Sequence, residues 1–152
     1  MFELMAAAKL LLTAPGSILG AERAKIEAKF GTPEGVGTDF MAAPAADGTK
    51  DRVITLDWPQ LRIRLYESGA THSVQLLGVT TTADLLKIDS PIHIGVDRST
   101  VLRELGGAAY EDQDQIVYSL REEDPSLPNQ TVRLVFRDNV VVGIDWTYPV
   151  SE

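Results

Sequence analysis

Two stretches of this chain follow one plan at a constant distance, and this repetition limits the folds open to it. The first runs from Gly20 to Gly31 and the second from Gly95 to Gly106, so both glycines recur 75 positions later. Three pairs between them match at the same offset: Arg23 with Arg98, Ile26 with Val101, and Phe30 with Leu105. Apolar residues four positions apart share a helix face, and glycine favours a helix end. Each stretch therefore predicts a short helix that its second glycine closes.

After each predicted helix, apolar and polar residues alternate, which is typical of antiparallel strands with one buried face. The predicted strands are 52–58, 61–67 and 73–79, then 115–121, 131–138 and 140–148. The strand 131–138 follows 61–67 at an offset of 71, which indicates a loop deletion of four residues. We expect an α+β fold in one domain, 1–152, with tandem helix-then-strand repeats at about 17–79 and 92–148. The repeats form one continuous antiparallel sheet with helices on one face.

The stretch 2–13 is mainly apolar and predicts another helix, which ends before Pro15 and Gly16 because proline disfavours continuation. Glu3 and Lys9 are unlike an export signal, and the run is too short to span a bilayer. We expect a cytoplasmic protein, or a periplasmic one if this stretch is a truncated export signal.

Three further local predictions follow from residue type. The segment 32–50 is rich in Gly, Pro, Ala and Asp and predicts a long loop, whereas 82–86 predicts a short helical turn. Asp97 precedes the second repeated helix and is a good N-cap, since its carboxylate can accept exposed backbone N–H groups. Trp58, Trp146 and Tyr148 alternate with the apolar set and are assigned mainly to the core.

Composition argues against several classes of protein. A net charge of −8 and a pI near 4.7 disfavour general binding of nucleic acid, which requires a basic surface. The absence of cysteine excludes disulfides, thiolate zinc sites and a cysteine nucleophile, and it favours a reducing compartment.

Catalytic motifs are also missing from the sequence. The two histidines, His72 and His93, lack the spacing of a metal-ligand set. No serine lies in a Gly-x-Ser-x-Gly elbow, and the glycine-rich stretch 31–37 lacks the Lys-Ser/Thr ending of a phosphate loop. The sequence therefore predicts a protein that is not an enzyme and has no metal or cofactor.

Two groups of polar residues are candidates for binding another protein. One is an arginine and tyrosine set on the polar sheet face, residue types that are enriched in interfaces. The other is a pair of acidic loops that flank the strand 115–121 and could meet a basic partner. The candidate residues are Arg62, Arg64, Tyr66, Tyr110, Glu111, Asp112, Asp114, Glu122, Glu123, Asp124, Arg133 and Arg137. Solvated loops, and an outer face whose arginines pair with Asp57 and Asp145, explain the same residues.

The plan of glycine, helix with an early arginine, Phe/Leu-Gly ending and alternating strands resembles the repeat of the beta-lactamase inhibitory proteins. Outer-membrane assembly lipoproteins of the SmpA/OmlA type carry a similar single unit. The resemblance spans about 17–148 and implies a protein that acts by binding another protein. Neither a lipobox cysteine nor the disulfide cysteines of the inhibitory family are present, so no contact residue is carried over. In architecture and charge the chain is also similar to small acidic immunity proteins that neutralise bacterial toxins.

We therefore expect a protein-binding inhibitor or immunity protein that occludes a toxin or enzyme. One alternative is a carrier or sensor of a small ligand, with a pocket near Trp58 or Trp146. Another is an envelope scaffold, which requires an exported chain. The partner and the oligomeric state do not follow from the sequence.

Overall fold

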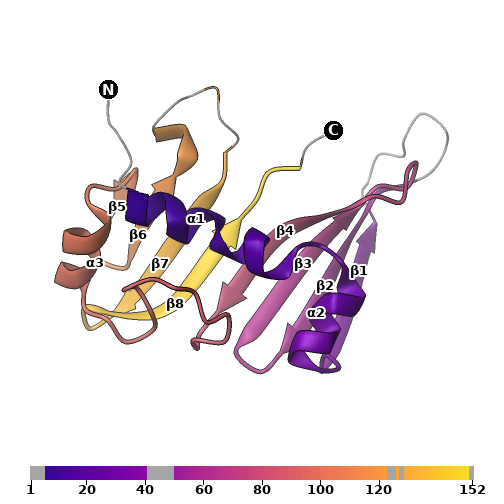
Figure 1. Ribbon diagram of the computed structural model, residues 1–152, viewed down its shortest axis with the longest axis horizontal. Coiled ribbons are helices and arrows are strands. Elements are labelled where there is room, and N and C mark those ends of the chain that lie inside the picture. Colours follow the sequence, from indigo (N-terminus) through magenta and orange to yellow (C-terminus); the bar gives the residue numbers. More distant parts are fainter. Residues whose placement is uncertain (1–5, 41–49, 123–125, 127–128, 151–152) are drawn as a thin grey trace.

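A computed structural model describes residues 6–40, 50–122, 126 and 129–150. Within them the chain forms three α-helices and one eight-stranded antiparallel sheet (Figure 1). The expected α+β class and continuous antiparallel sheet are confirmed. The helices are α1 (Ala6–Leu19), α2 (Arg23–Phe30) and α3 (Arg98–Leu105), with a 3-10 turn at Leu120–Glu122. The strands are β1 (Gly35–Phe40), β2 (Arg52–Trp58), β3 (Leu61–Glu67), β4 (Val74–Thr81), β5 (Tyr110–Glu111), β6 (Gln115–Ser119), β7 (Thr131–Arg137) and β8 (Val140–Thr147).

The strand order is β1-β2-β3-β4-β8-β7-β6-β5, so the first four strands form one meander and the last four form another. The two meanders join where β4 pairs antiparallel with β8, from Gly78 opposite Thr147 to Thr81 opposite Ile144. This pairing of the fourth strand with the eighth makes one sheet of the two meanders. The short strand β5 is the edge of the sheet on one side, and the longer strand β1 is the edge on the other.

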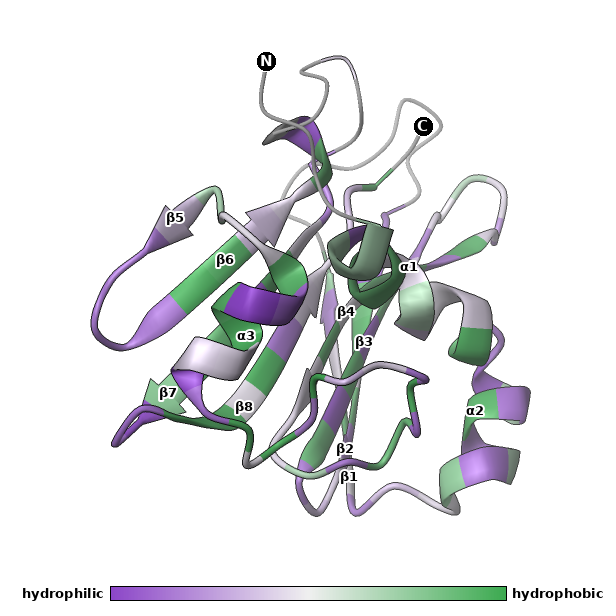
Figure 2. Ribbon diagram, turned by 60° about the vertical axis from the view of Figure 1, so that its left-hand side comes forward, coloured by the Kyte–Doolittle hydropathy of each residue, from purple (hydrophilic) through white to green (hydrophobic). Residues whose placement is uncertain are grey.

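The buried core follows the alternation of the strands, as along β3, where hydrophobic and hydrophilic residues follow in turn (Figure 2). Leu56, Ile63, Val79 and Trp146 are each at most 1% exposed and belong to one hydrophobic cluster. That cluster also takes in buried side chains of all three helices, namely Ala8, Leu11, Leu12, Leu19, Ile26, Val101 and Leu105. Burial of this apolar surface is the main stabilising contribution to such a fold.

The two repeated helices end in the same way. Gly31 and Gly106 follow α2 and α3 with φ of 85° and 80°, a region that glycine enters without a Cβ penalty. The carbonyl oxygen of Gly31 accepts the Trp58 indole N–H at 3.0 Å. The carbonyl oxygen of Gly106 accepts the Tyr118 hydroxyl at 2.9 Å. In both meanders, therefore, an aromatic residue of the second strand fixes the end of the preceding helix.

The two meanders also break register at matching places. A bulge lies between Arg64 and Leu65 in the β3–β4 pairing, and another between Val135 and Phe136 in the β7–β8 pairing. These positions are 71 apart, whereas Trp58 and Tyr118 are 60 apart. The change of offset from 75 to 71 is therefore not a single deletion of four residues.

The prediction that the first helix ends before Pro15 is wrong, because α1 continues through Pro15 to Leu19. Proline has no N–H to donate to the carbonyl four residues earlier, which here belongs to Leu11. That oxygen instead accepts the indole N–H of Trp146 at 2.9 Å. The next carbonyl, of Leu12, accepts the side-chain amide of Gln130 at 2.6 Å. Donors from the opposite end of the chain thus stabilise the helix at its proline.

The predicted loop 32–50 is wrong in part, because 35–40 forms the edge strand β1, while 41–49 lie outside the described residues. The acidic stretch after α3 similarly contains the two-residue strand β5. The segment 82–86 forms bends rather than a helical turn, and the start of the predicted helix 2–13 lies outside the described residues. The other strands begin or end within about two residues of their predicted bounds, a normal uncertainty at strand and helix ends.

Candidate protein-binding surface

A row of side chains crosses the polar face of the sheet through all eight strands. The antiparallel register places its members opposite one another in the order Gly35, Asp57, Arg62, Thr80, Asp145, Arg133, Val117 and Tyr110. Three predicted residues therefore lie in the same row, Arg62 in the first meander and Arg133 and Tyr110 in the second.

Both of these arginines are engaged within the sheet. Arg62 Nε donates to Asp57 Oδ1 at 2.7 Å, and this bond raises the pKa of the guanidinium above its ordinary value. Arg133 Nη2 donates to Asp145 Oδ2 at 3.1 Å, while the Thr80 hydroxyl donates to Asp145 Oδ1 at 2.7 Å. Pairing with Asp57 and Asp145 is the alternative explanation that the sequence left open, and for these two arginines it holds.

Arg64 differs from its neighbours on the same face. It lies in the next row, between Thr55 of β2 and Gly78 of β4, and it is partly buried. A Cβ at Gly78 would lie 2.7 Å from Arg64 Nη2, so the guanidinium rests directly over this glycine. Among the described residues Arg64 has no ion-pair or hydrogen-bond partner. It is a partly buried cation on the third strand of the sheet, and its guanidinium lies over Gly78.

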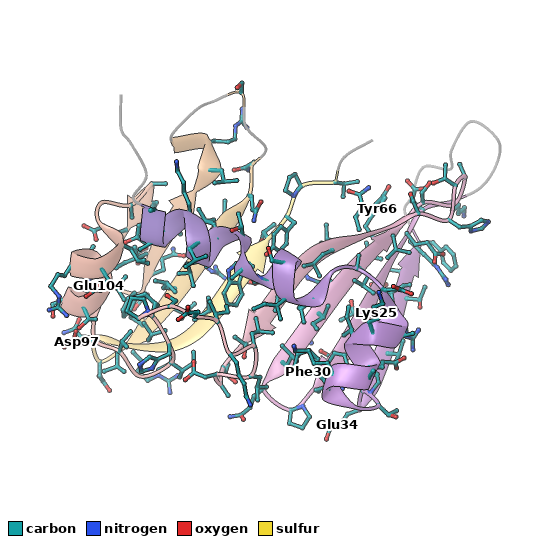
Figure 3. All side chains as sticks on the ribbon, in the orientation of Figure 1. Lys25, Phe30, Glu34, Tyr66, Asp97 and Glu104 are labelled. Carbon is teal, nitrogen blue, oxygen red and sulfur yellow. The ribbon has the colours of Figure 1, made fainter. Side chains whose placement is uncertain are left out.

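The remaining two members of the arginine and tyrosine set are placed differently, since Tyr66 shares the face of Arg64 two residues further along β3, whereas Arg137 belongs to β7. Tyr66 lies towards the end of β3, where its hydroxyl donates to the Asp51 carboxylate, and Asp51 also accepts the backbone N–H of Gly69 at 2.9 Å. Arg137 is exposed at the far end of β7, beside the turn to β8. Figure 3 shows Tyr66 at the opposite end of the molecule from Asp97, and Asp97 bridges to Val140 directly after the turn that follows Arg137. The structure thus does not bring Tyr66 and Arg137 together.

The first acidic loop is organised by its own hydrogen bonds. Asp112 Oδ1 accepts the backbone N–H groups of Asp114 and Gln115 at 2.8 and 3.1 Å, and Asp112 Oδ2 accepts the Tyr110 hydroxyl at 2.9 Å. These bonds, that from the Asp114 N–H foremost, lower the pKa of Asp112. Asp112 therefore holds a turn together, because a carboxylate that accepts several N–H groups is already satisfied.

Arg98, which the sequence reasoning placed only in the repeated pattern, secures the same loop. Its Nη2 donates to the carbonyl oxygen of Asp112 at 2.6 Å and lies 3.5 Å from a carboxylate oxygen of Glu111. Its guanidinium lies 5.1 Å from the ring centroid of Phe136, a cation–π contact. The sequence at the start of α3 did not predict this contact, because the partners of Arg98 lie in the later segment from β5 to β7.

The second acidic run contributes less to the described surface. Glu123 and Asp124 lie outside the described residues, and Glu122 ends the 3-10 turn after β6. The first run precedes β6 and the second follows it, so the two lie at opposite ends of this strand.

The histidines do not form a site with neighbouring ligands. His93 Nδ1 lies 2.9 Å from the carbonyl oxygen of Ile94 and 3.9 Å from a carboxylate oxygen of Asp84. His72 lies in the turn before β4, with a positive φ of 59°. Across the described part of the chain, no three His, Asp or Glu side chains are grouped to hold a metal ion.

Two of the hollows on the helix side of the sheet bear on the small-ligand alternative. One, of about 180 Å³, lies against Trp146 and Ile144 beneath the segment 82–93 and is smaller than the usual ligand pocket. The other, of about 410 Å³, lies between the start of α2 and the sheet, with Ile54, Leu65 and Val74 as its apolar lining. Arg52 and Glu67 close its rim through a bond of 2.6 Å that lowers the pKa of Glu67.

No described helix of the chain is long and apolar enough to cross a membrane. The chain matches no family model, and neither the curated proteins nor the solved structures contain a match to it. The resemblances to inhibitory and immunity proteins therefore stay predictions.

Proposed function

We propose that this chain is a non-enzymatic module that binds another protein through the polar face of its sheet, as an inhibitor or an immunity protein does. Arg64 carries the proposal. Its guanidinium lies over Gly78, and its donors lack a partner among the described residues. Arg62 and Arg133 are paired within the sheet, whereas Arg64 is not paired within the described part of the chain. The guanidinium of Arg64 is therefore a group on this face that can bind a second molecule.

The proposal includes a duplicated architecture, in which two helix-and-meander units share one sheet and the helices cover one face. Three matched features support duplication: the glycine closures of α2 and α3, the aromatic donors Trp58 and Tyr118, and the paired bulges. Burial supports the one-sided covering, because the buried residues of the helices and of alternate strand positions belong to one cluster. The other face is then left free for docking.

The partner that fits Arg64 presents a carboxylate at the centre of its contact surface. Arginine binds carboxylates through two parallel N–H···O bonds, which gives direction as well as strength. Thr55 and Thr147 lie in the same row as Arg64 and add hydroxyl groups around it. The net charge of −8 favours approach of a partner that is basic overall. A stable contact buries on the order of 1,600 Å² in total, a size compatible with a broad sheet face.

The test compares charge-reversal variants in a binding assay with extracts of the native host, followed by purified partner. We expect Arg64→Glu to lose a protein that the wild-type chain retains, because the new carboxylate repels that of the partner. Arg103→Glu is the matched control, since Arg103 is an exposed residue of α3 that does not belong to the sheet. With purified partner, titration calorimetry should show at least ~100-fold weaker binding for Arg64→Glu, or about 2.7 kcal/mol.

Retention of the same protein by Arg64→Glu would contradict the proposal, and so would the absence of any retained protein. Tight binding of a metabolite without a protein partner would favour the carrier alternative, for which the hollow of about 410 Å³ beside α2 offers an apolar lining. A change of Ile54→Arg in that hollow would then abolish the thermal shift that the metabolite causes.

A further inference from the structure

The two edges of the sheet differ in how open they are. At one edge β5 has two residues, and the turn that follows it is held by Asp112 and Arg98. At the other edge β1 has six residues, of which the last five are exposed. An exposed edge strand has unpaired backbone N–H and C=O groups that can pair with another strand. Only β1 offers such an edge at useful length among the described strands.

The exposed side chains of β1 are unusual for a free edge. Val36 and Phe40 are 50% and 63% exposed, and they lie on the same side of the strand because they are four positions apart. Edges that are protected from association usually carry charged residues, lysine above all, proline or a bulge. The segment 35–40 has a single charged residue, Asp39, and no lysine or proline, and its pairing with β2 is regular over all six residues.

We propose that two copies of this chain associate through β1, antiparallel about a twofold axis that passes through Thr38. In this register Val36 of each copy lies opposite Phe40 of the other, and the two Thr38 side chains lie opposite each other. The register keeps the polar faces of both sheets on one side, since residues opposite in an antiparallel pair point the same way. Apolar and Thr–Thr pairs of this kind stabilise neighbouring strands.

A second copy fits this edge better than an unrelated strand, because the sequence of β1 is self-complementary about Thr38. On the polar side each Asp39 lies opposite Gly37 of the other copy, so neither carboxylate faces another directly. The twofold arrangement also closes, whereas pairing of β1 with the short β5 of a neighbour would leave free edges and extend into a filament. This association uses the edge and not Arg64, so it is independent of the proposed function.

The oligomeric state of purified protein tests the association. We expect a dimer in size-exclusion chromatography with light scattering at about 100 µM, and a monomer for Val36→Lys with Phe40→Lys, because opposed lysines repel and desolvate poorly. Val142→Lys is the matched control, since Val142 is 36% exposed on β8, away from the edge. Circular dichroism should show that all three proteins are folded.

The register has its own test, because the chain contains no cysteine. Thr38→Cys should form a disulfide-linked dimer under mild oxidation, since opposed residues of antiparallel strands lie within the Cα separation that a disulfide spans. Val142→Cys should stay largely unlinked. A wild-type monomer at this concentration, or a dimer that survives both lysine changes, would overturn the proposal. A dimer in which Thr38→Cys does not cross-link would overturn the register.

Discussion

Trp146 donates its indole N–H to the carbonyl oxygen of Leu11, the oxygen that the ring of Pro15 leaves without a helical donor. The bond spans 135 positions of sequence and is buried. It explains how an apolar helix can contain a proline and still pack against the sheet. It also makes the stability of α1 depend on β8.

The first prediction concerns this bond. Trp146→Phe should lower the free energy of unfolding by about 1–3 kcal/mol, because it leaves a buried carbonyl without a donor, in addition to the lost ring volume. Pro15→Ala supplies an N–H that can take over the Leu11 carbonyl. The double variant should therefore lose less than the sum of the single losses, measured by urea denaturation. Strict additivity would show that the bond does not compensate for the proline.

The second prediction concerns Tyr118, whose hydroxyl bonds to the Gly106 carbonyl at the end of α3. Burial raises the pKa of this phenol. The folded pKa lies above the unfolded one, so its contribution to stability is present below a pH of about 10 and is lost as the pH rises towards the folded pKa. Tyr118→Phe should cost about 1 kcal/mol at neutral pH and should make the alkaline loss of stability less steep. Tyr148 also titrates late through burial, so some alkaline loss remains in the variant. If Tyr118→Phe loses stability at alkaline pH as steeply as the wild type, groups other than Tyr118 cause that loss.

The third prediction concerns the N-cap of α3. Hydrogen bonds from Thr100, and then from Ser99, lower the pKa of Asp97. Its contribution to stability is therefore present above the ordinary aspartate pKa of about 3.9 and is lost as the pH falls through the folded value. Asp97→Ala should be less stable than wild type at pH 7, and the two should converge in acid. Glu22 occupies the same position before α2 and makes no side-chain cap bond, so Glu22→Ala serves as the control with little effect. Equal losses in the two variants would argue against capping as the cause.

The fourth prediction concerns the glycine beneath Arg64. Gly78→Ala places a Cβ 2.7 Å from Arg64 Nη2 and 3.1 Å from the carbonyl oxygen of Trp146. We expect a loss of about 1–3 kcal/mol from overpacking and displacement of the guanidinium. Gly143→Ala is the matched control, because its Cβ would meet nothing closer than 3.6 Å. Arg64→Ala should restore part of the stability in the Gly78→Ala background, and thermal unfolding of the four proteins checks this. If it restores none, the contact with the Trp146 carbonyl dominates.

The features that could be predicted are those that neighbouring residues determine. The glycine ends of both repeated helices follow from local spacing, and Asp97 caps α3 as expected. Six strands follow from alternation, because one buried face imposes a period of two on the sequence. The polar-face position of Arg64 follows from the same alternation.

The features that could not be predicted depend on distant partners. Helix α1 continues through Pro15 because Trp146 supplies a donor from the far end of the sequence. Strand β1 forms because β2 supplies its backbone partners, while its own residues include two glycines and no buried side chain. Asp112 has the appearance of a binding residue in the sequence, and only the fold shows that Arg98 and the turn engage it.

The strand order has a consequence for synthesis of the chain. β8 is made after every other strand, yet it lies inside the sheet between β4 and β7 and provides the indole for α1. A nascent chain that has emerged only as far as β7 cannot align its two meanders. The edge of β4 that pairs with β8 then stays unpaired. Since ribosomes add about 5–20 residues per second, this exposed period lasts for seconds, and the native sheet is completed only once β8 has left the ribosomal tunnel.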